Sequence, residues 1–285
     1  MPFRILQEIA MATMSYLGSR DSYLQETLIR REDAMHKSVN HLLLYVYEVL
    51  SFEISYEYVD TILTGPVARF ARQIASQGYI VAAPSSYHEF TGPEPLAYDG
   101  PGTDKGNEWK IAKRVSAYDE DAELSVTALL ELPTCNGRIG ATGMCLGGHL
   151  AYRCALDSRV SAAVCYFATD IHSHSLGEGK NDDSLARAGD IKGELVMIFG
   201  KKDNHVPPEG RDLIRKTLTE KGVLFSWYEV AWAQHAFIRD ELSKGRYDPA
   251  IAGICFEMLK EVFNRTLRSD LGPRTGEEKE VENIC

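Results

Sequence analysis

A regular alternation of apolar, strand-length runs with amphipathic segments of helical length constrains the fold of this chain more than any other feature. Continuous apolar runs of this kind are typical of strands that are covered on both faces. The expected strands are 42–47, 79–84, 138–143, 160–168, 194–200 and 224–231, and the expected helices are 67–77, 111–131, 147–156, 209–221 and 249–266. Strands that alternate with helices form a parallel sheet through right-handed crossovers. We therefore predict an α/β protein with a mainly parallel sheet, helices on both faces, and a ligand site at the carboxyl ends of the strands.

The organisation along the chain is that of one large domain. A length of 285 residues with 44% hydrophobic content suffices for a single buried core, so we assign residues 1–268 to one domain. Within this domain, residues 1–40 have a mixed pattern that predicts no definite element. Residues 85–110 are rich in Gly, Pro, Asp and Asn, and they are expected to form a long surface excursion. Residues 269–285 are polar and acidic, and we expect this tail to be poorly ordered.

The net charge and the cysteines indicate which binding partners and which cellular compartment to expect. The net charge is −10 with no basic stripe, which argues against nucleic-acid binding, and any anionic substrate needs a local cation. The six cysteines form no CxxC pair, which fits a reducing compartment. No apolar run approaches the roughly 18 uncharged residues of a membrane span, and the first residues lack the apolar core and cleavage site of a leader. We expect a cytoplasmic protein that binds neither nucleic acid nor membrane.

The segment GMCLGG, residues 143–148, lies at the junction of an expected strand and an expected helix. This is the context of a nucleophile elbow, in which Cys145 takes the place where serine is commoner and the flanking glycines avoid clashes at a sharp, strained turn. The helix N-terminus favours the thiolate, and the backbone N–H of Leu146 is suited to donate to an oxyanion. Alone, the motif fits equally well a buried structural cysteine on a glycine-rich turn.

Two further residues follow later strands at the same expected edge of the sheet. Asp203 comes after 194–200 and His235 comes after 224–231, in the chain order nucleophile, acid, histidine. An aspartate in this position is by itself often only a turn or helix-capping residue. The HSH pattern at His172 and His174 suggests a metal site, but no third ligand has suitable spacing, so we predict no metal and no cofactor. The three residues together favour a catalytic triad.

With these motifs in place, the sequence resembles the dienelactone hydrolase (carboxymethylenebutenolidase) family of α/β-hydrolases over residues 42–266. The resemblance rests on GMCLGG around Cys145, GKKDNHVP around Asp203, QHAF around His235, and YEV at 47–49. It implies an α/β-hydrolase fold and a Cys145, Asp203 and His235 triad. It further implies that Glu48 contacts the thiol and that Val49 supplies, with Leu146, the second oxyanion N–H. Glu48 is otherwise explained as a solvated strand end.

The resemblance also bears on the substrate. The family's type substrate is a lactone with a free carboxylate, and Arg239 matches one of the arginines that grip it, although a surface arginine explains this residue equally. The other arginine follows a Pro-x-x-Tyr segment, but here Tyr87 is followed by His88 and Glu89. Tyr87 and His88 are candidates either for the lining of a roomier pocket or for loop anchors.

We expect a hydrolase that opens a small-molecule lactone or ester through a thioester on Cys145. A broader ester, thioester or C–C hydrolase of secondary metabolism is the first alternative, and a non-catalytic ligand-binding protein on the same fold is the second. A homodimer is compatible with the sequence.

Overall fold

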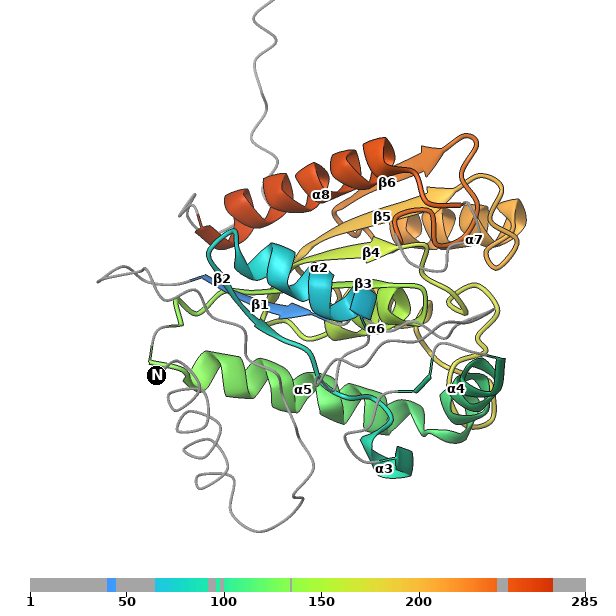
Figure 1. The fold of residues 1–285 in the computed structure, drawn as a ribbon, viewed down its shortest axis with the longest axis horizontal. Coiled ribbons are helices and arrows are strands. Elements are labelled where there is room, and N and C mark those ends of the chain that lie inside the picture. Colours follow the sequence, from blue (N-terminus) through green and yellow to red (C-terminus); the bar gives the residue numbers. More distant parts are fainter. Residues whose placement is uncertain are drawn as a thin grey trace, which may run out of the picture.

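The computed structural model describes residues 65–91, 96–97, 100–133, 135–239 and 246–268, together with the backbone of 40–44 (Figure 1). Its centre is a six-stranded sheet with the strand order β2-β1-β3-β4-β5-β6. The strands are β1 (Asn40–Leu44), β2 (Tyr79–Ala82), β3 (Ile139–Met144), β4 (Val160–Tyr166), β5 (Glu194–Gly200) and β6 (Phe225–Val230). Every neighbouring pair runs parallel. The predicted parallel sheet is confirmed, and the carboxyl ends of its strands share one edge.

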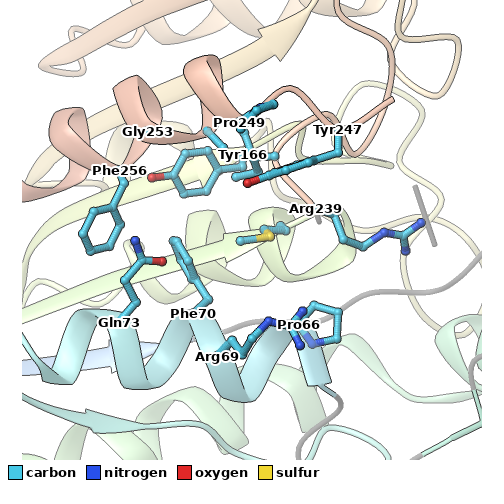
Figure 2. A pocket seen from close by; sticks show the side chains of 13 residues that line it. Pro66, Arg69, Phe70, Gln73, Tyr166, Arg239, Tyr247, Pro249, Gly253 and Phe256 are labelled. Carbon is cyan, nitrogen blue, oxygen red and sulfur yellow. The ribbon is translucent and has the colours of Figure 1, made fainter. Parts of the chain in front are cut away.

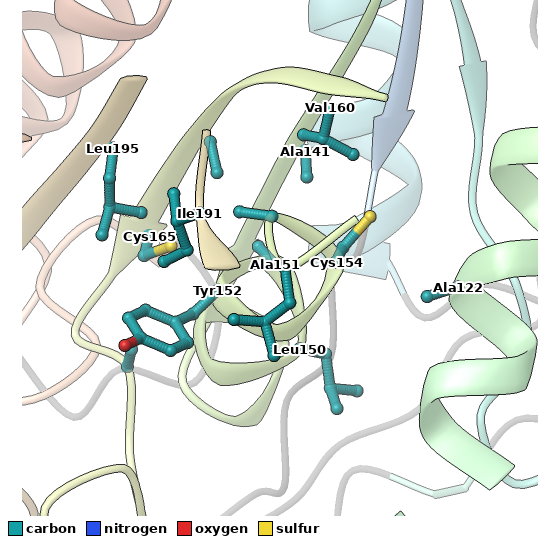
Figure 3. Close-up of a cluster of buried hydrophobic side chains, with 14 of the residues drawn as sticks. Ala122, Ala141, Leu150, Ala151, Tyr152, Cys154, Val160, Cys165, Ile191 and Leu195 are labelled. Atoms are coloured by element: carbon teal, nitrogen blue, oxygen red, sulfur yellow. The ribbon is translucent and has the colours of Figure 1, made fainter. Parts of the chain in front are cut away.

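Helices cover both faces of the sheet, as predicted. The helices are α2 (Gly65–Ala75), α3 (His88–Thr91), α4 (Gly100–Ala112), α5 (Val115–Glu131), α6 (Leu146–Cys154), α7 (Pro208–Glu220) and α8 (Pro249–Phe263), with a 3₁₀ turn at Ala188–Asp190 and a π-helical turn at Asn264–Arg268. One buried cluster joins α2 and α8 to the sheet, and a second joins α5, α6 and α7 to its other face. Such burial on both faces explains why the central strands β3, β4 and β5 are largely apolar rather than alternating, and Figure 3 shows part of the cluster that includes α6.

The α2 and α8 layer illustrates how the sequence forms these elements. Apolar residues of α2 recur at Val67, Phe70, Ala71 and Ile74, which places them on one helical face, and all four are buried. Asp248 caps the N-terminus of α8, since its carboxylate accepts hydrogen bonds from two backbone N–H groups of the first turn. Its buried Phe256 contacts Phe70 edge to face, with 6.0 Å between the ring centroids. Segments almost 190 residues apart thus form one layer.

The expectation of an irregular excursion over 85–110 is wrong in its second half, because α4 occupies residues 100–112. The sequence GPGTDKGNEWKIA has a low intrinsic helix propensity, so tertiary contacts must stabilise this helix. Gly102, Gly106 and Trp109 are buried on one side of it. The Trp109 ring stacks on Phe90 of α3, with 5.5 Å between the ring centroids and 8° between the ring planes. Burial of one large ring and close approach at two glycines therefore outweigh propensity.

The expectations for residues 1–39 and for the tail 269–285 lie outside the described residues. In the part of the chain that the structure describes, no helix is long and apolar enough to cross a membrane.

Candidate active site

Cys145 lies at the sharp turn between β3 and α6, as the motif predicts. Its backbone has φ 58° and ψ −120°, a conformation that costs free energy for any residue with a Cβ. Hydrogen bonds hold the turn on both sides: the Cys145 N–H donates to the Tyr166 carbonyl at 3.0 Å, and its carbonyl accepts from Thr169 N–H at 3.3 Å. A strained residue that is held by such bonds at a sheet edge is typical of an active site rather than of a structural cysteine.

Gly148 allows α6 to pack closely behind this turn. A Cβ at this position would lie 2.7 Å from the Tyr166 carbonyl oxygen and 3.1 Å from Cα of Ala168. Only glycine fits there without a backbone shift, so the last residue of GMCLGG fixes the distance between α6 and β4. The first residue of α6, Leu146, is fully buried, and its N–H belongs to the helix N-terminus, where no carbonyl of the preceding turn can accept it.

Asp203 and His235 meet as expected. His235 donates from Nδ1 to Oδ2 of Asp203 at 2.8 Å, and both side chains are buried. The other carboxylate oxygen of Asp203 accepts from the backbone N–H of His205 at 2.8 Å. The hydrogen bond from the His205 N–H holds the Asp203 carboxylate in place, and the carboxylate in turn orients the imidazole of His235.

The close approach of the loops after β5 and β6 depends on Gly200. A Cβ at Gly200 would collide with the backbone of Ala233 and Gln234. The loop is also tied to the strand end, because Lys202 N–H donates to the Ala233 carbonyl at 2.9 Å. The missing side chain therefore lets the segment that carries His235 cross the end of β5 and reach Asp203.

The electrostatic state of His235 links it to Cys145. Burial alone lowers the pKa of His235, but the adjacent Cys145 sulfur and the hydrogen bond to Asp203 outweigh this effect, and they raise the pKa to about 10. His235 and the Cys145 sulfur also share a hydrogen bond. His235 is therefore protonated at neutral pH, with its ring beside the Cys145 sulfur.

The structure also brings two residues to His235 that sequence analysis did not single out. His205 stacks on the imidazole, with 4.2 Å between the ring centroids, and Phe167 contacts it edge to face at 5.0 Å. Phe167 has a positive φ of 37°. His205 belongs to the GKKDNHVP motif, but the order of residues in a motif does not indicate that the His205 ring stacks on His235.

A second serine, histidine and aspartate cluster is buried at α6. His149 Nε2 is 2.7 Å from the Ser184 hydroxyl and 3.6 Å from the Asp182 carboxylate. His149 and Ser184 are fully buried, Arg153 donates to the same hydroxyl, and burial lowers the pKa of His149 to about 4. Without access for a substrate, this cluster is structural, and it anchors the loop after β4 to α6.

Arg239 is buried and lines a cavity of about 280 Å³ between α2 and α8 (Figure 2). Met144, which precedes Cys145, lines the same cavity. The structure therefore places Arg239 beside the elbow rather than on the outer surface.

Tyr87 and His88 do not line this cavity. Tyr87 donates from its hydroxyl to the Gly106 carbonyl at 3.1 Å and packs on Trp109, while His88 Nε2 is 3.2 Å from Asp121. Through these contacts Tyr87 and His88 anchor α3 and α4.

Glu48 and Val49 lie outside the described residues. Among the described residues, no group of three or more His, Cys, Asp or Glu side chains is arranged to hold a metal ion, and His172 and His174 form no such group.

Comparison with known proteins shows the family of this chain. A model of the dienelactone hydrolase family matches residues 64–267, which include the elbow, Asp203 and His235. The chain belongs to the dienelactone hydrolase family. A Saccharomyces cerevisiae protein assigned as a carboxymethylenebutenolidase is 56% identical over 227 residues, covering 78% of this chain and 83% of the relative. The Pseudomonas putida carboxymethylenebutenolidase is 27% identical over 181 residues, covering 60% of this chain and 68% of the relative.

Solved structures support the fold of this dienelactone hydrolase family member. A Klebsiella pneumoniae protein assigned as a dienelactone hydrolase superposes with a TM-score of 0.68 at 18% identity, covering 87% of this chain and 95% of the other. At that identity the likeness speaks for the α/β-hydrolase fold alone. Family membership makes the chain a carboxylic ester hydrolase.

Proposed function

We propose that this enzyme hydrolyses a small lactone or ester through Cys145 as nucleophile, with a thioester intermediate. The observation that carries the proposal is the Asp203, His235 and Cys145 chain of contacts, in which His235 has a pKa of about 10 beside the sulfur of a strained elbow residue. A cysteine sulfur that shares a hydrogen bond with a histidine oriented by an aspartate is the arrangement of an activated nucleophile.

In the acylation step, the Cys145 thiolate attacks the carbonyl carbon and the carbonyl electrons move to oxygen. The N–H of Leu146, at the N-terminus of α6, is the donor we assign to this oxyanion, and Val49 keeps the role that the family resemblance implies. When the tetrahedral species collapses, the C–O bond of the lactone or ester breaks. The leaving oxygen takes the proton from the His235 imidazolium, and the acyl group remains on sulfur as a thioester.

In deacylation His235 acts as a base, whereas in acylation it acts as an acid. Acylation removes the charge of Cys145, which is the strongest influence that raises the pKa of His235. The pKa of the imidazole therefore falls, and His235 becomes a base that takes a proton from water as water attacks the thioester carbonyl. The C–S bond breaks, the thiolate is restored, and the carboxylic acid leaves. Asp203 holds the ring in the tautomer that both steps need.

Mass spectrometry of the enzyme with a panel of lactones, esters and thioesters tests the proposal. The expected result is a mass gain equal to the acyl group on Cys145, and this gain is absent from Cys145→Ala. Turnover of Cys145→Ala falls by roughly 1000-fold or more, while its circular dichroism spectrum and melting temperature stay close to those of the wild type. The panel member that acylates fastest reports whether the substrate is a lactone or one of the broader ester or thioester classes.

Two outcomes contradict the proposal. Full turnover by Cys145→Ala rules out the nucleophile. Failure of iodoacetamide to modify Cys145 in preference to Cys135, which is partly exposed, combined with no turnover of any panel member, favours a ligand-binding protein on the hydrolase fold.

A further inference from the structure

Strand β6 forms one outer edge of the sheet that the structure describes. Among the described residues it pairs with β5 alone (Figure 1). On the β5 side, the carbonyls of Leu224 and Val230 each accept a backbone N–H at 2.9 Å. Because successive residues of a strand direct their backbone groups to opposite sides, Phe225, Trp227 and Glu229 direct N–H and C=O groups away from β5. These groups are open for pairing with a further strand.

The edge lacks the features that usually prevent such pairing. Strand β6 has the sequence FSWYEV, which contains no proline, lysine or arginine. Its one charged residue, Glu229, has partners inside the chain, since its carboxylate accepts from Arg211 at 3.3 Å and from Trp227 Nε1 at 3.0 Å. An edge strand with open backbone groups and no unpaired charge of its own favours association with another strand.

Exposed apolar side chains are concentrated at β6 and at the helix that packs against it. Leu224 and Trp232 flank the strand and are both 56% exposed, and Tyr228 within the strand is 40% exposed. Leu213 of α7, the helix whose Arg211 binds β6, is 42% exposed. These four are half of the eight large hydrophobic side chains that are exposed among the described residues. Such a concentration is typical of an interaction surface.

The positions of the open backbone groups fit a second copy of the same strand. About a two-fold axis at Trp227, two antiparallel β6 strands place Trp227 opposite its own copy and Phe225 opposite Glu229. All three positions carry open N–H and C=O groups, so each opposed pair exchanges two hydrogen bonds. The same register covers Tyr228 with Ser226 of the other copy. Symmetry thus supplies a matching partner that an unrelated strand would have to reproduce.

Helix α7 has charges that suit the same arrangement. On its exposed side, Glu209 and Asp212 lie in the first half, and Arg215 and Lys216 lie in the second half, followed by Glu220. The first half is therefore acidic, and the second half keeps a positive charge. Because the two-fold axis reverses the direction of the other copy, the acidic half of one α7 faces the more basic half of the other. The charges favour the antiparallel dimer rather than oppose it.

We infer that β6 is a homodimer interface, in which the β6 strands of two copies pair antiparallel about a two-fold axis at Trp227 and join their two sheets into one. The strand is short, so the buried surface lies at the low end of specific interfaces, below about 1,200 Å² in total. Association of this kind corresponds to a dissociation constant of roughly 1–100 μM. The inference is independent of the proposed function, because each copy carries its own Cys145, Asp203 and His235.

Sedimentation velocity of the full chain over a range of concentrations tests the interface. The average mass of the wild type is expected to rise toward that of two chains as the concentration increases. Tyr228→Lys sets two like charges beside the axis and should raise the dissociation constant by roughly tenfold or more. Leu124→Lys makes the same change at a side chain of α5 that is 37% exposed, and it should leave the dissociation constant unchanged.

Two results of this experiment overturn the inference. One is a wild type that stays monomeric up to several hundred micromolar. The other is an equal effect of Tyr228→Lys and Leu124→Lys, because association would then depend on overall charge and not on β6. The melting temperature of Tyr228→Lys should stay close to that of the wild type, since the substituted side chain is exposed.

A pair of introduced cysteines tests the register. In Ser226→Cys/Tyr228→Cys, the thiols of opposite copies belong to a non-hydrogen-bonded pair, whose Cα atoms lie about 4.5 Å apart, within reach of a disulfide. Oxidation is expected to give a covalent dimer on a non-reducing gel. Ser226→Cys alone should give none, since position 226 lies opposite position 228 and not opposite itself. No covalent dimer from the double variant, or equal amounts from both variants, overturns antiparallel pairing about Trp227.

Discussion

The imidazole of His205 lies across the imidazole of His235, with 4.2 Å between the ring centroids and 36° between the ring planes. Burial of the His205 ring and the charge of His235 lower the pKa of His205 below its usual 6.5. As the pH falls through that lowered pKa, a second cation forms against the His235 imidazolium. This like-charge contact opposes the protonated state of His235.

From this contact we predict a pH effect in His205→Phe, which keeps a ring in place but carries no charge. The ratio of kcat/KM at pH 5 to that at pH 7.5 should be roughly two- to fivefold higher than in the wild type, because a partly solvated charge contact is worth about 0.5–1 kcal/mol. His174→Phe serves as the control, since this histidine contacts the Asp182 carbonyl and not His235. Identical pH profiles of the wild type and His205→Phe contradict the prediction.

The titration of His235 should depend on Cys145. In the wild type its pKa is raised to about 10, with the Cys145 sulfur as the strongest raising influence. Removing the sulfur in Cys145→Ala should move the pKa back toward the ordinary value, and NMR titration of the ring nitrogens measures the shift. A His235 titration that is the same in both proteins means that no ion pair forms.

The same raised pKa predicts how stability changes with pH. The folded protein holds the His235 proton more tightly than the unfolded chain, so the contribution is complete below about pH 6.5 and is lost as the pH rises to about 10. The difference in free energy of unfolding between the wild type and His235→Ala should therefore shrink across this interval in urea titrations. A difference that grows with pH has the wrong sign for this pairing.

Gly148→Ala should destabilise the protein by about 1–3 kcal/mol, because its Cβ would lie 2.7 Å from a backbone oxygen. Activity should fall as well, since the same shift moves the turn at Cys145. Gly253→Ala, in the interior of α8 with nothing within 4 Å, should instead stabilise by about 0.5–1 kcal/mol. Urea unfolding of the two variants checks the contrast, and similar values would mean that α6 has room to move.

Lys113 carries a further prediction for stability. Its ammonium group is buried, donates to Asp121 of α5 at 2.7 Å and to the Ser86 carbonyl at 2.8 Å, and pairs with Glu89 of α3 at 3.3 Å. Lys113→Met leaves the buried carboxylate without its cation and should cost about 3–5 kcal/mol, whereas Lys113→Met with Asp121→Leu should cost less. Lys105→Met, which breaks an exposed pair with Glu108 and a cation–π contact with Trp109, should change stability by no more than about 1 kcal/mol.

The sequence was sufficient to predict the parts of the site that depend on topology. Cys145, Asp203 and His235 each follow a strand, and in a parallel sheet the carboxyl ends of strands share an edge, so chain order alone places them together. Gly200 and Gly148 allow the close backbone approaches on which the final positions of these residues depend, and the sequence pattern does not predict those approaches.

The remaining features depend on tertiary packing. Helix α4 forms against its propensity because Trp109 is buried on Phe90, and Tyr87 and His88 are used by the same packing. Arg69 has the pattern of an ordinary polar position on an amphipathic helix. It lines a cavity only because α8, 180 or more residues further along the chain, forms the other side of that cavity.

The separation of α2 and α8 from the strand-end loops has a consequence for divergence within the family. The residues of the candidate triad belong to the turns after β3, β5 and β6, whereas the cavity of about 280 Å³ is lined mainly by two helix faces. Substitutions on those faces can therefore accumulate without altering the turns that carry Cys145, Asp203 and His235. Positions 69, 73 and 253 are thus sites at which related chains can differ while the edge of the sheet stays the same.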